Sequence, residues 1–279
     1  MNEIICKDGL IRFKNTFNSP FTNAMLEYFK NYDKIELPDN FCYSIDDLPD
    51  NIREIKFNKS YNEYVNKYPA KLEILIVNEN YSRKLENLPD GLQILNFVYF
   101  SKYNWKMDNL PESLRILNLP YEYNCENGLD NLPERMDTLI VNGYNTNINF
   151  GKLPKNLREI SLDYWDNNLI NLPDNLEKLF VQSGPNLKLD KLPVNLKKLE
   201  INGFNGNLDN LPIGLKMLCI GNANIPLDFL PETLEFLRIP YRYYDYDLCN
   251  LPRSLKLLQV NCHYSGYIPE WVKVEILYY

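Results

Sequence analysis

Residues 171–181 read NLPDNLEKLFV, and two later stretches restate the same pattern: KLPVNLKKLEI at 191–201 and NLPIGLKMLCI at 210–220. The Leu-Pro pair and the later apolar positions are kept in all three stretches, while the residues between them change. A pattern that returns at a nearly fixed interval is typical of a chain built from short structural repeats. The fold is therefore decided by this unit and by how often it recurs.

The unit recurs along most of the 279 residues. A Leu-Pro pair or a close variant returns every 19–22 residues, with the prolines at Pro49, Pro69, Pro89, Pro111, Pro133, Pro154, Pro173, Pro193, Pro212, Pro231 and Pro252. Aligned on this pair, the unit reads L-D-N-L-P-x-x-L-x-x-L-x-I/V and is followed by a variable stretch. Tyr68-Pro69 is the loosest copy of the pair. Eleven copies indicate a repeat architecture.

Each recurring residue of the unit has a physical reason. Proline fixes φ near about −65° and lacks an N–H group, so it suits the corner of a tight turn. The final L-x-I/V alternates between two faces, as a short strand does. The kept apolar residues point inward and stack on the same positions of the next coil, because no single repeat can bury its own apolar face. A unit this short leaves no room for a full helix, so we expect a parallel β-sheet on one side and turn, 3₁₀ or extended segments on the other.

An asparagine step follows several predicted strands. It occurs at Tyr144-Asn145, Phe204-Asn205 and Ala223-Asn224, with Asp166 in the matching place of another coil and apolar residues three positions later at Ile148, Leu208, Leu227 and Leu169. We interpret this step as a ladder of side-chain amides that bond the turn backbone of adjacent coils. Ligand contact is the alternative, but a register repeated through the stack favours a packing role.

These residues carry a family resemblance. LPxxLxxLxI units of about 20 residues resemble leucine-rich repeats, close to the short type of bacterial effectors. The stretch FNGNLDNLP at 204–212 more specifically resembles the FNIP repeat of slime moulds and of giant viruses of amoebae. The resemblance covers roughly residues 45–265. It implies a leucine-rich-repeat solenoid, and members of such families serve mainly as binding scaffolds.

The two ends depart from the repeat. EIICKDGLIRF at 3–13 predicts a hairpin about Asp8-Gly9, and TNAMLEYFKNY at 22–32 predicts a helix with Thr22 or Asn23 as its N-cap. We expect residues 1–44 to form a small α+β cap, 45–265 to hold about eleven repeats, and 266–279 to form a closing strand. An unpaired final strand can pair with another chain. A homodimer through an end strand is therefore one hypothesis.

Composition disfavours most kinds of chemistry. The net charge is −7 and no basic stripe occurs, so a nucleic-acid partner is not expected. Six separated cysteines and the single His263 do not have the spacing of a metal site or a disulfide framework. No phosphate-binding, dinucleotide-binding or metalloprotease motif occurs. We expect no catalytic, cofactor or metal site, no membrane partner, and an intracellular protein, in the host cytoplasm if the source is viral.

We expect binding on the face formed by the strands, where the residues at outward-facing positions vary between repeats. The candidate protein-binding residues are Ile74, Ile76, Ile94, Ile116, Ile140, Phe180, Phe236 and Arg238. The isoleucines would form an apolar stripe, and exposed apolar patches usually mark interaction sites. Alternatively, the N-terminal cap or long loops cover this face. A second candidate is aromatic: VYFSKYNW at 98–105, YEYNCEN at 121–127 and YRYYDYD at 241–247 hold either interface anchors or loop-filling side chains.

Two functions fit these features. The first is a non-enzymatic repeat scaffold that binds another, unidentified protein through the strand face. The alternative is a substrate-recognition subunit of a ubiquitin ligase, because many FNIP-type proteins carry an F-box before their repeats. An F-box consists of helices, whereas this chain opens with a predicted hairpin. The alternative would require residues 1–44 to bind an adaptor.

Overall fold

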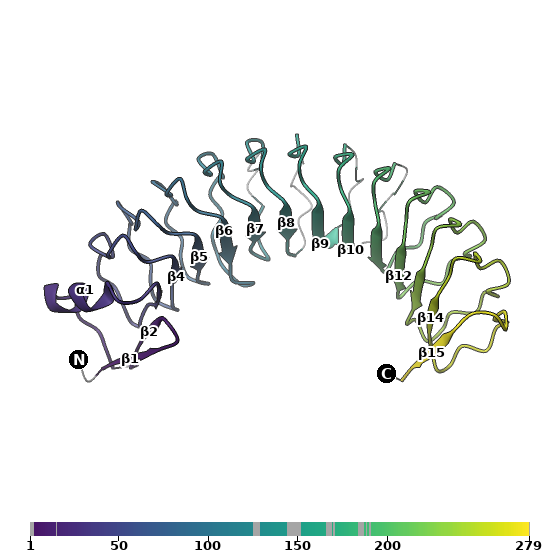
Figure 1. Ribbon diagram of the computed structural model, residues 1–279, viewed down its shortest axis with the longest axis horizontal. Helices are drawn as coiled ribbons and strands as arrows, with labels where there is room; N and C mark the ends of the chain where they lie inside the picture. Colours follow the sequence, from purple (N-terminus) through teal and green to yellow (C-terminus); the bar gives the residue numbers. More distant parts are fainter. Residues whose placement is uncertain are drawn as a thin grey trace. The chain divides into compact units, whose positions relative to one another are not determined.

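The computed structural model describes residues 3–14, 16–124, 129–143, 152–165, 169, 171–183, 187, 189 and 191–278. The chain divides into two compact units, Met1–Pro154 and Lys155–Tyr279. The division falls within the predicted repeat region, directly after the Leu-Pro pair of one coil. Each unit is a stack of coils, and each coil contributes one strand and one loop (Figure 1).

Unit 1 consists of a short cap and five full coils. Its elements are β1 (Ile4–Lys7), β2 (Leu10–Phe13), α1 (Asn23–Phe29), β3 (Lys34–Glu36), β4 (Glu54–Lys56), β5 (Ile74–Val77), β6 (Ile94–Phe97), β7 (Ile116–Leu119) and β8 (Thr138–Val141). β1 and β2 pair antiparallel, and every later strand pairs parallel with the one before it. The sheet of this unit therefore follows chain order.

Unit 2 repeats the same arrangement without a helix among its described residues. Its strands are β9 (Glu159–Trp165), β10 (Lys178–Ser183), β11 (Lys198–Asn202), β12 (Met217–Gly221), β13 (Phe236–Ile239), β14 (Leu257–Asn261) and β15 (Val274–Leu277). All neighbours pair parallel. The strand expected at 266–279 is present as β15. Where the chain is described, only turns, bends and extended segments connect the strands of this unit, which confirms the predicted solenoid.

The cap contains the predicted hairpin and helix. Asp8 and Gly9 both have positive φ, at 51° and 80°, as a two-residue hairpin turn requires. Thr22 is the N-cap of α1, and its hydroxyl accepts a 3.4 Å hydrogen bond from the Met25 N–H. The helix ends at Phe29, three residues before the predicted end. The Asn31 side chain donates to the Tyr28 carbonyl at 3.0 Å, so it bonds the backbone where another helical N–H would have done so.

The Leu-Pro pair forms the corner that was predicted. The proline carbonyl accepts a hydrogen bond from the leucine N–H three residues later, as from Leu72 to Pro69 and from Leu92 to Pro89, both at 3.0 Å. The next two N–H groups then donate to the preceding coil: those of Glu73 and Ile74 both bond the Arg53 carbonyl. The corner therefore closes a tight turn and sets the register of the strand that follows.

Unit 1 also holds a buried aromatic column that the repeat pattern did not reveal. The column takes one aromatic residue from each of five successive coils, all with almost no exposure: Phe41, Tyr61, Tyr81, Tyr103 and Tyr123. The rings of Tyr61 and Tyr81 are stacked, with centroids 6.3 Å apart. The predicted aromatic stretches hold both kinds of side chain: Tyr103, Tyr123 and Tyr244 are buried and fill the loops, whereas Tyr99, Phe100, Trp105, Tyr243 and Tyr246 are exposed. Residues 125–127 lie outside the described part.

The predicted ladder of polar side chains is confirmed at several coils. Asn224 donates to the Asp245 carboxylate at 2.7 Å and accepts from the Asp245 N–H at 3.2 Å. The Asn104 side chain makes the same pair of contacts with Asn124, at 2.6 and 3.0 Å. Leu169, Leu208 and Leu227 are buried as expected, whereas Tyr144, Asn145, Ile148 and Asp166 lie outside the described residues. At these coils the ladder joins neighbouring turns after the strands.

We predict that Tyr61→Phe stabilises the protein. The Tyr61 ring is fully buried, and its hydroxyl has no hydrogen-bond partner in the described structure. Removing an unsatisfied buried hydroxyl should raise the free energy of unfolding by about 1 kcal/mol at neutral pH. Burial also raises the pKa of Tyr61, so the wild type should lose stability above about pH 10 more steeply than the variant. Urea denaturation followed by circular dichroism measures both effects.

Tyr103→Phe is the matched control. Tyr103 occupies the same place two coils later, but its hydroxyl accepts a 3.2 Å hydrogen bond from the buried Leu85 N–H. Its removal leaves that N–H unsatisfied and should lower the free energy of unfolding by about 1–3 kcal/mol. Equal effects of the two substitutions would show that the bonding of the hydroxyl does not decide their stability.

Candidate protein-binding surface

The strand face of unit 1 presents two columns of outward side chains. In each strand from β5 to β8, fully buried residues alternate with half-buried ones, as the predicted register requires. Ile74, Ile94 and Ile116 pair with one another on successive strands, and Thr138 continues their column. The structure therefore brings three of the five predicted isoleucines into contact range as one apolar column.

The second column mixes isoleucine with asparagine. Ile76 pairs with Asn96, Asn96 with Asn118, and Asn118 with Ile140. The two isoleucines therefore lie at opposite ends of the column and are separated by two amides. The predicted continuous apolar stripe is limited to the first column.

The amides of this column form a hydrogen-bonded ladder that sequence reasoning missed. Asn118 donates to the Asn96 side-chain oxygen at 2.7 Å, and Asn142, directly after β8, donates to the Asn118 oxygen at 2.8 Å. The sequence contains an indication of this ladder, because Asn96 and Asn118 occupy the same position in consecutive repeats. Mutual bonding holds these amides in fixed orientations, so the face offers ordered donors and acceptors beside an apolar column.

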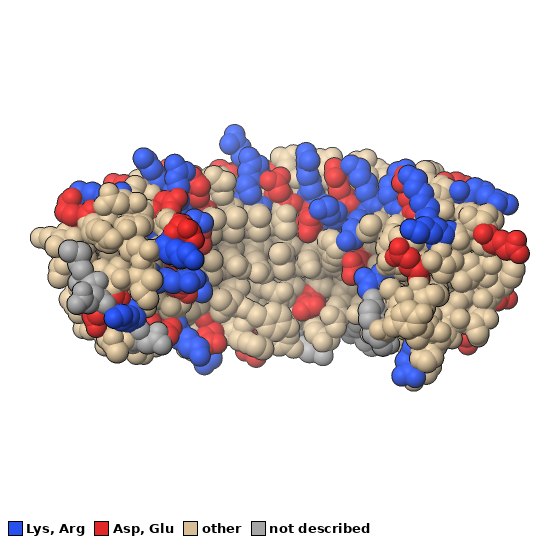
Figure 2. Space-filling model, turned by 60° about the horizontal axis from the view of Figure 1, so that its bottom comes forward, with Lys and Arg blue, Asp and Glu red and all other residues tan. Residues whose placement is uncertain are grey.

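Ion pairs border this uncharged area. Glu36 accepts from Arg12 at 2.7 Å and from Lys56 at 2.5 Å, and Lys34 lies 3.0 Å from Glu54. Partial burial opposes ionisation of Glu36, but the bonds from Lys56 and Arg12 outweigh it and lower its pKa. Further pairs, Arg53 with Glu73 and Arg115 with Asp137, join residues that lie directly before the strands. Figure 2 shows such rows of blue and red side chains beside a largely uncharged surface.

The cap does not lie flat on the strand face. β2 pairs with β3 and β3 with β4, so the hairpin continues the sheet edge to edge. The isoleucines are half-buried by their neighbours on the sheet rather than enclosed in the core. This arrangement favours an accessible face over the alternative in which the cap covers it.

In unit 2 the predicted residues do not form one patch. Phe180 lies between Ser161 and Glu200 in the sheet register, and the Lys198 ammonium lies 4.6 Å from the centre of its ring. Phe236 lies instead between Met217 and Leu257, in an apolar column three coils away. Phe180 and Phe236 therefore have different surroundings and different neighbours.

Arg238 flanks a residue whose exposure was predicted wrongly. It lies between Cys219 and Gln259 in the sheet register. Cys219 occupies one of the alternating strand positions that the repeat pattern predicts to face outward, but its exposed fraction is only 7%, and burial raises the pKa of its thiol to about 11. Its sheet neighbours in the register are Glu200 and Arg238, which both have longer side chains.

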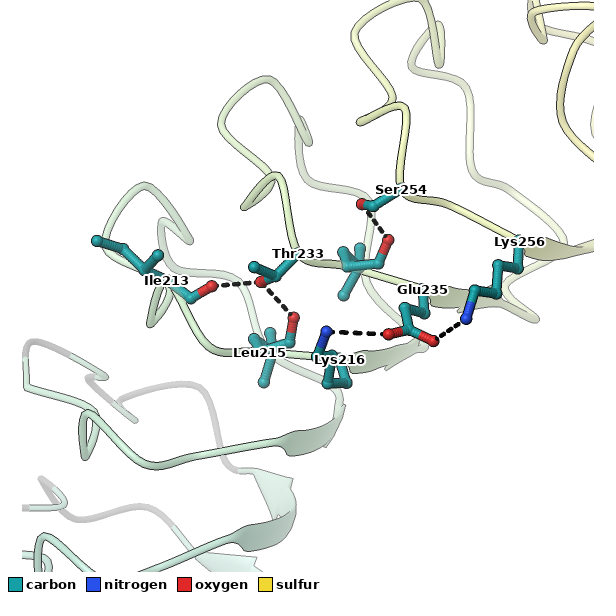
Figure 3. A network of polar contacts seen from close by, with 8 residues as sticks. Ile213, Leu215, Lys216, Thr233, Glu235, Ser254 and Lys256 are labelled. Atoms are coloured by element: carbon teal, nitrogen blue, oxygen red, sulfur yellow. Dashed lines mark hydrogen bonds and ion pairs between the residues drawn. The ribbon is translucent and has the colours of Figure 1, made fainter.

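A network of charges and hydroxyls joins three coils along the edge of the unit 2 sheet (Figure 3). Glu235 accepts from Lys256 at 2.6 Å and from Lys216 at 2.9 Å. These hydrogen bonds lower the pKa of Glu235 to about 2. Thr233 donates to the Ile213 and Leu215 carbonyls, and Ser254 to the Leu234 carbonyl. The network therefore fastens each coil to the one before it.

Little in the described structure resembles a reactive centre. Among the described residues no group of three His, Cys, Asp or Glu side chains could hold a metal ion, and five cysteines are free thiols. Cys125 lies outside this part. An open hollow of about 470 Å³ is lined by Lys102, Asn104, Tyr121, Glu122 and Asn124, but its amides and charges are mostly exposed. No helix within the described ranges has the length and apolarity needed to cross a bilayer.

Glu235→Gln should remove a pH-dependent part of the stability. A carboxyl group whose folded pKa lies near 2, below an unfolded value of about 4.3, stabilises the fold above pH 4.3 and loses this effect as the pH falls toward 2. The wild type should therefore be more stable than the variant at about pH 6, and the difference should shrink toward pH 2. Chemical denaturation across this range measures it. Glu112→Gln, an exposed residue outside every ion pair of the described chain, is the control. A difference that stays constant with pH would contradict the prediction.

Comparisons with known proteins agree with this architecture. No protein-family model matches the sequence, and no curated protein does either. Among solved structures, the chain is similar to CroV588, described as a novel circular LRR protein, with a TM-score of 0.72 and 21% identity over 95% of this chain and 46% of that one. It is also similar to YopM from Yersinia enterocolitica WA-314, with a TM-score of 0.54 and 22% identity over 88% of this chain and 60% of that one.

These likenesses concern the fold. The chain spans about half the length of CroV588 and less than two thirds of YopM. The more specific resemblance of the repeats to the FNIP repeat stays a prediction, because no family model matches the sequence. The parallel strands, the short loops and these structural neighbours together identify the fold as a leucine-rich-repeat solenoid.

Proposed function

We propose that this chain is a non-enzymatic repeat scaffold that binds another protein through the strand face of unit 1. The observation that carries the proposal is the uncharged area formed by the isoleucine column and the amide ladder. Its side chains come from rigid strands, so a partner would not have to order them. Binding to a pre-ordered surface costs less conformational entropy.

The composition of this area suits a protein partner. Apolar side chains beside satisfied polar groups, inside a charged rim, are the usual anatomy of protein–protein interfaces. The charged residues beside this area are already paired with one another, as Lys34 is with Glu54 and Arg115 with Asp137. A binding protein would therefore displace water from isoleucine and asparagine without stripping isolated charges.

A scaffold without catalysis is supported by the dispersal of reactive groups. His263 is exposed, and its backbone N–H bonds Asn261 at 3.1 Å. Free thiols such as Cys219 and Cys262 lie on separate coils. General acid–base or nucleophilic catalysis needs two or three groups within hydrogen-bonding reach. The His263 side chain makes no hydrogen bond to a thiol or a carboxylate among the described residues.

No specific observation favours the ubiquitin-ligase alternative. Between residues 3 and 44 the described chain contains one helix, α1, of seven residues. β2 and β3 of this region are already paired in the sheet. Adaptor binding through residues 1–44, an intracellular location and a homodimer through an end strand remain predictions from the sequence.

The double variant Ile76→Glu/Ile140→Glu tests the proposal. It places a carboxylate at each end of the amide column, and burying an unpaired charge in an interface should weaken partner binding by at least about tenfold. Partners are first identified by affinity purification and mass spectrometry from the native cell with the wild-type chain. Binding of the purified partner is then measured with wild type and variant by surface plasmon resonance.

A matched control separates binding from folding. Tyr64 is exposed in the same unit and lies outside the strands, so Tyr64→Glu adds the same charge away from the strand face. Thermal unfolding should show that all three proteins fold, with a lower midpoint for Ile76→Glu/Ile140→Glu because both isoleucines are half-buried. Unchanged partner affinity in a folded Ile76→Glu/Ile140→Glu protein would overturn the strand-face proposal.

A further inference from the structure

The residue that follows the Leu-Pro pair can be compared between the eleven repeats of this chain. Eight of eleven coils place a charged residue there, and the remaining three have Ala70, Val194 and Ile213. The charged set is Asp50, Asp90, Glu112, Glu134, Lys155, Asp174, Glu232 and Arg253. The fold therefore does not require an apolar side chain at this corner, yet two consecutive coils of unit 2 carry one.

A third departure lies on the next coil. The residue before the Leu-Pro pair is Asn, Asp or Lys in ten of the eleven repeats, and Phe229 replaces it in the remaining one. The exposed fractions of Val194, Ile213 and Phe229 are 71%, 84% and 67%. Single exposed apolar residues are ordinary, but three on consecutive coils, at positions that are mostly polar or charged elsewhere in the repeats, depart from the pattern together. We name these three residues the corner ridge.

The geometry places the ridge on adjacent turns. Thr233, on the third coil, donates its hydroxyl to the Ile213 carbonyl, and an added Cβ on Gly214 would lie 3.7 Å from the Val194 carbonyl oxygen. In Figure 3 the Ile213 side chain points away from these polar contacts. Thr233 thus bonds the Ile213 corner to the next coil, and the Val194 and Gly214 corners lie in contact, while the side chains of Val194 and Ile213 are exposed.

Carboxylates flank the ridge in the same column. Reading successive coils, the residue after Leu-Pro is Asp174, Val194, Ile213 and then Glu232. Neither Asp174 nor Glu232 takes part in an ion pair in the described part of unit 2. Exposed Asp209 and Asp228 precede the same corners.

Cations near the ridge are mostly engaged. Lys197 pairs with Glu177 at 3.1 Å, and Lys216 pairs with Glu235. Lys191 is exposed at the first coil of the ridge and lies outside every ion pair of the described chain. The ridge is therefore an apolar surface bounded mainly by available negative charge.

We propose that the corner ridge is a second docking surface, distinct from the strand face, and that its partner is an amphipathic helix whose apolar stripe is flanked by lysine or arginine. Neighbouring coils are about 4.8 Å apart and helix turns about 5.4 Å, so successive turns of such a helix can contact successive coils. Its cations would face Asp174 and Glu232. A second copy of this chain, with a net charge of −7, and an anionic membrane fit the flanking carboxylates less well.

The experiment uses two fluorescein-labelled peptides of about 18 residues with the same leucine stripe at helical spacing, one with lysine and one with glutamate on the polar face. Fluorescence anisotropy measures their binding to the full chain. We expect the lysine peptide to bind at least about tenfold more tightly, and Val194→Ser/Ile213→Ser to weaken it about tenfold. Asp174→Asn/Glu232→Gln should weaken it and reduce its dependence on salt.

Two control variants make the result specific. Phe100→Ser removes an equally exposed apolar residue in unit 1, and it should leave binding of the lysine peptide unchanged. Ile76→Glu/Ile140→Glu should also leave it unchanged, so this proposal and the strand-face proposal can fail separately. All substituted ridge positions are exposed, and thermal unfolding should confirm that the variants fold.

Several results would overturn the proposal. Equal binding of the lysine peptide to wild type and Val194→Ser/Ile213→Ser would show general attraction to an acidic protein. Light scattering that shows a wild-type dimer lost in the same variant would assign the ridge to a second copy. Co-sedimentation of wild type, but not of that variant, with phosphatidylserine-containing vesicles would assign it to a lipid surface.

Discussion

The structure depends on one constraint: no coil can bury its own apolar face. Leu75 and Leu95 are fully buried only because the equivalent leucine of the next strand lies beside each of them in the parallel register. Apolar residues must therefore occupy the same inward-facing positions in every coil. A polar residue at one of these positions would remove apolar contacts from the equivalent residues of the two neighbouring coils. This requirement accounts for the regularity of the sequence, and it allows the residues at outward-facing positions to vary.

Hydrogen bonds between coils fix how this apolar stack is spaced. Backbone bonds join the strands, and side chains join the corners, as Asn175 does with the Lys155 carbonyl and Asn195 with the Asp174 carbonyl, both at 2.9 Å. These amides give such asparagines an architectural role, because each one satisfies a carbonyl that a short loop would otherwise leave without a protein partner. Polar repeat letters are thus part of the architecture.

The sequence predicted most of this architecture, because period-two alternation and a fixed repeat together determine which side chains point inward. Ile74 and Ile116 face outward as expected, and β15 closes the described sheet of unit 2. Exposure was harder to predict, since it depends on the lengths of neighbouring side chains on other coils. Cys219 is buried for this reason, and the amide ladder of Asn118 required the exact pairing of coils. The division between Pro154 and Lys155 has no local signal in the repeat letters.

The two surfaces differ in how clearly they indicate function. Ile74, Ile94 and Ile116 are half-buried and neighbour one another on successive strands, so part of their retention serves the sheet itself. At the Leu-Pro corner, charged residues in eight other coils show that the same backbone turn forms without an apolar side chain. Val194 and Ile213 therefore contribute little to the stack, since most of each side chain remains in water. In a repeat protein, a departure at a position that the fold leaves free is better evidence for a partner than an apolar residue that the sheet also uses.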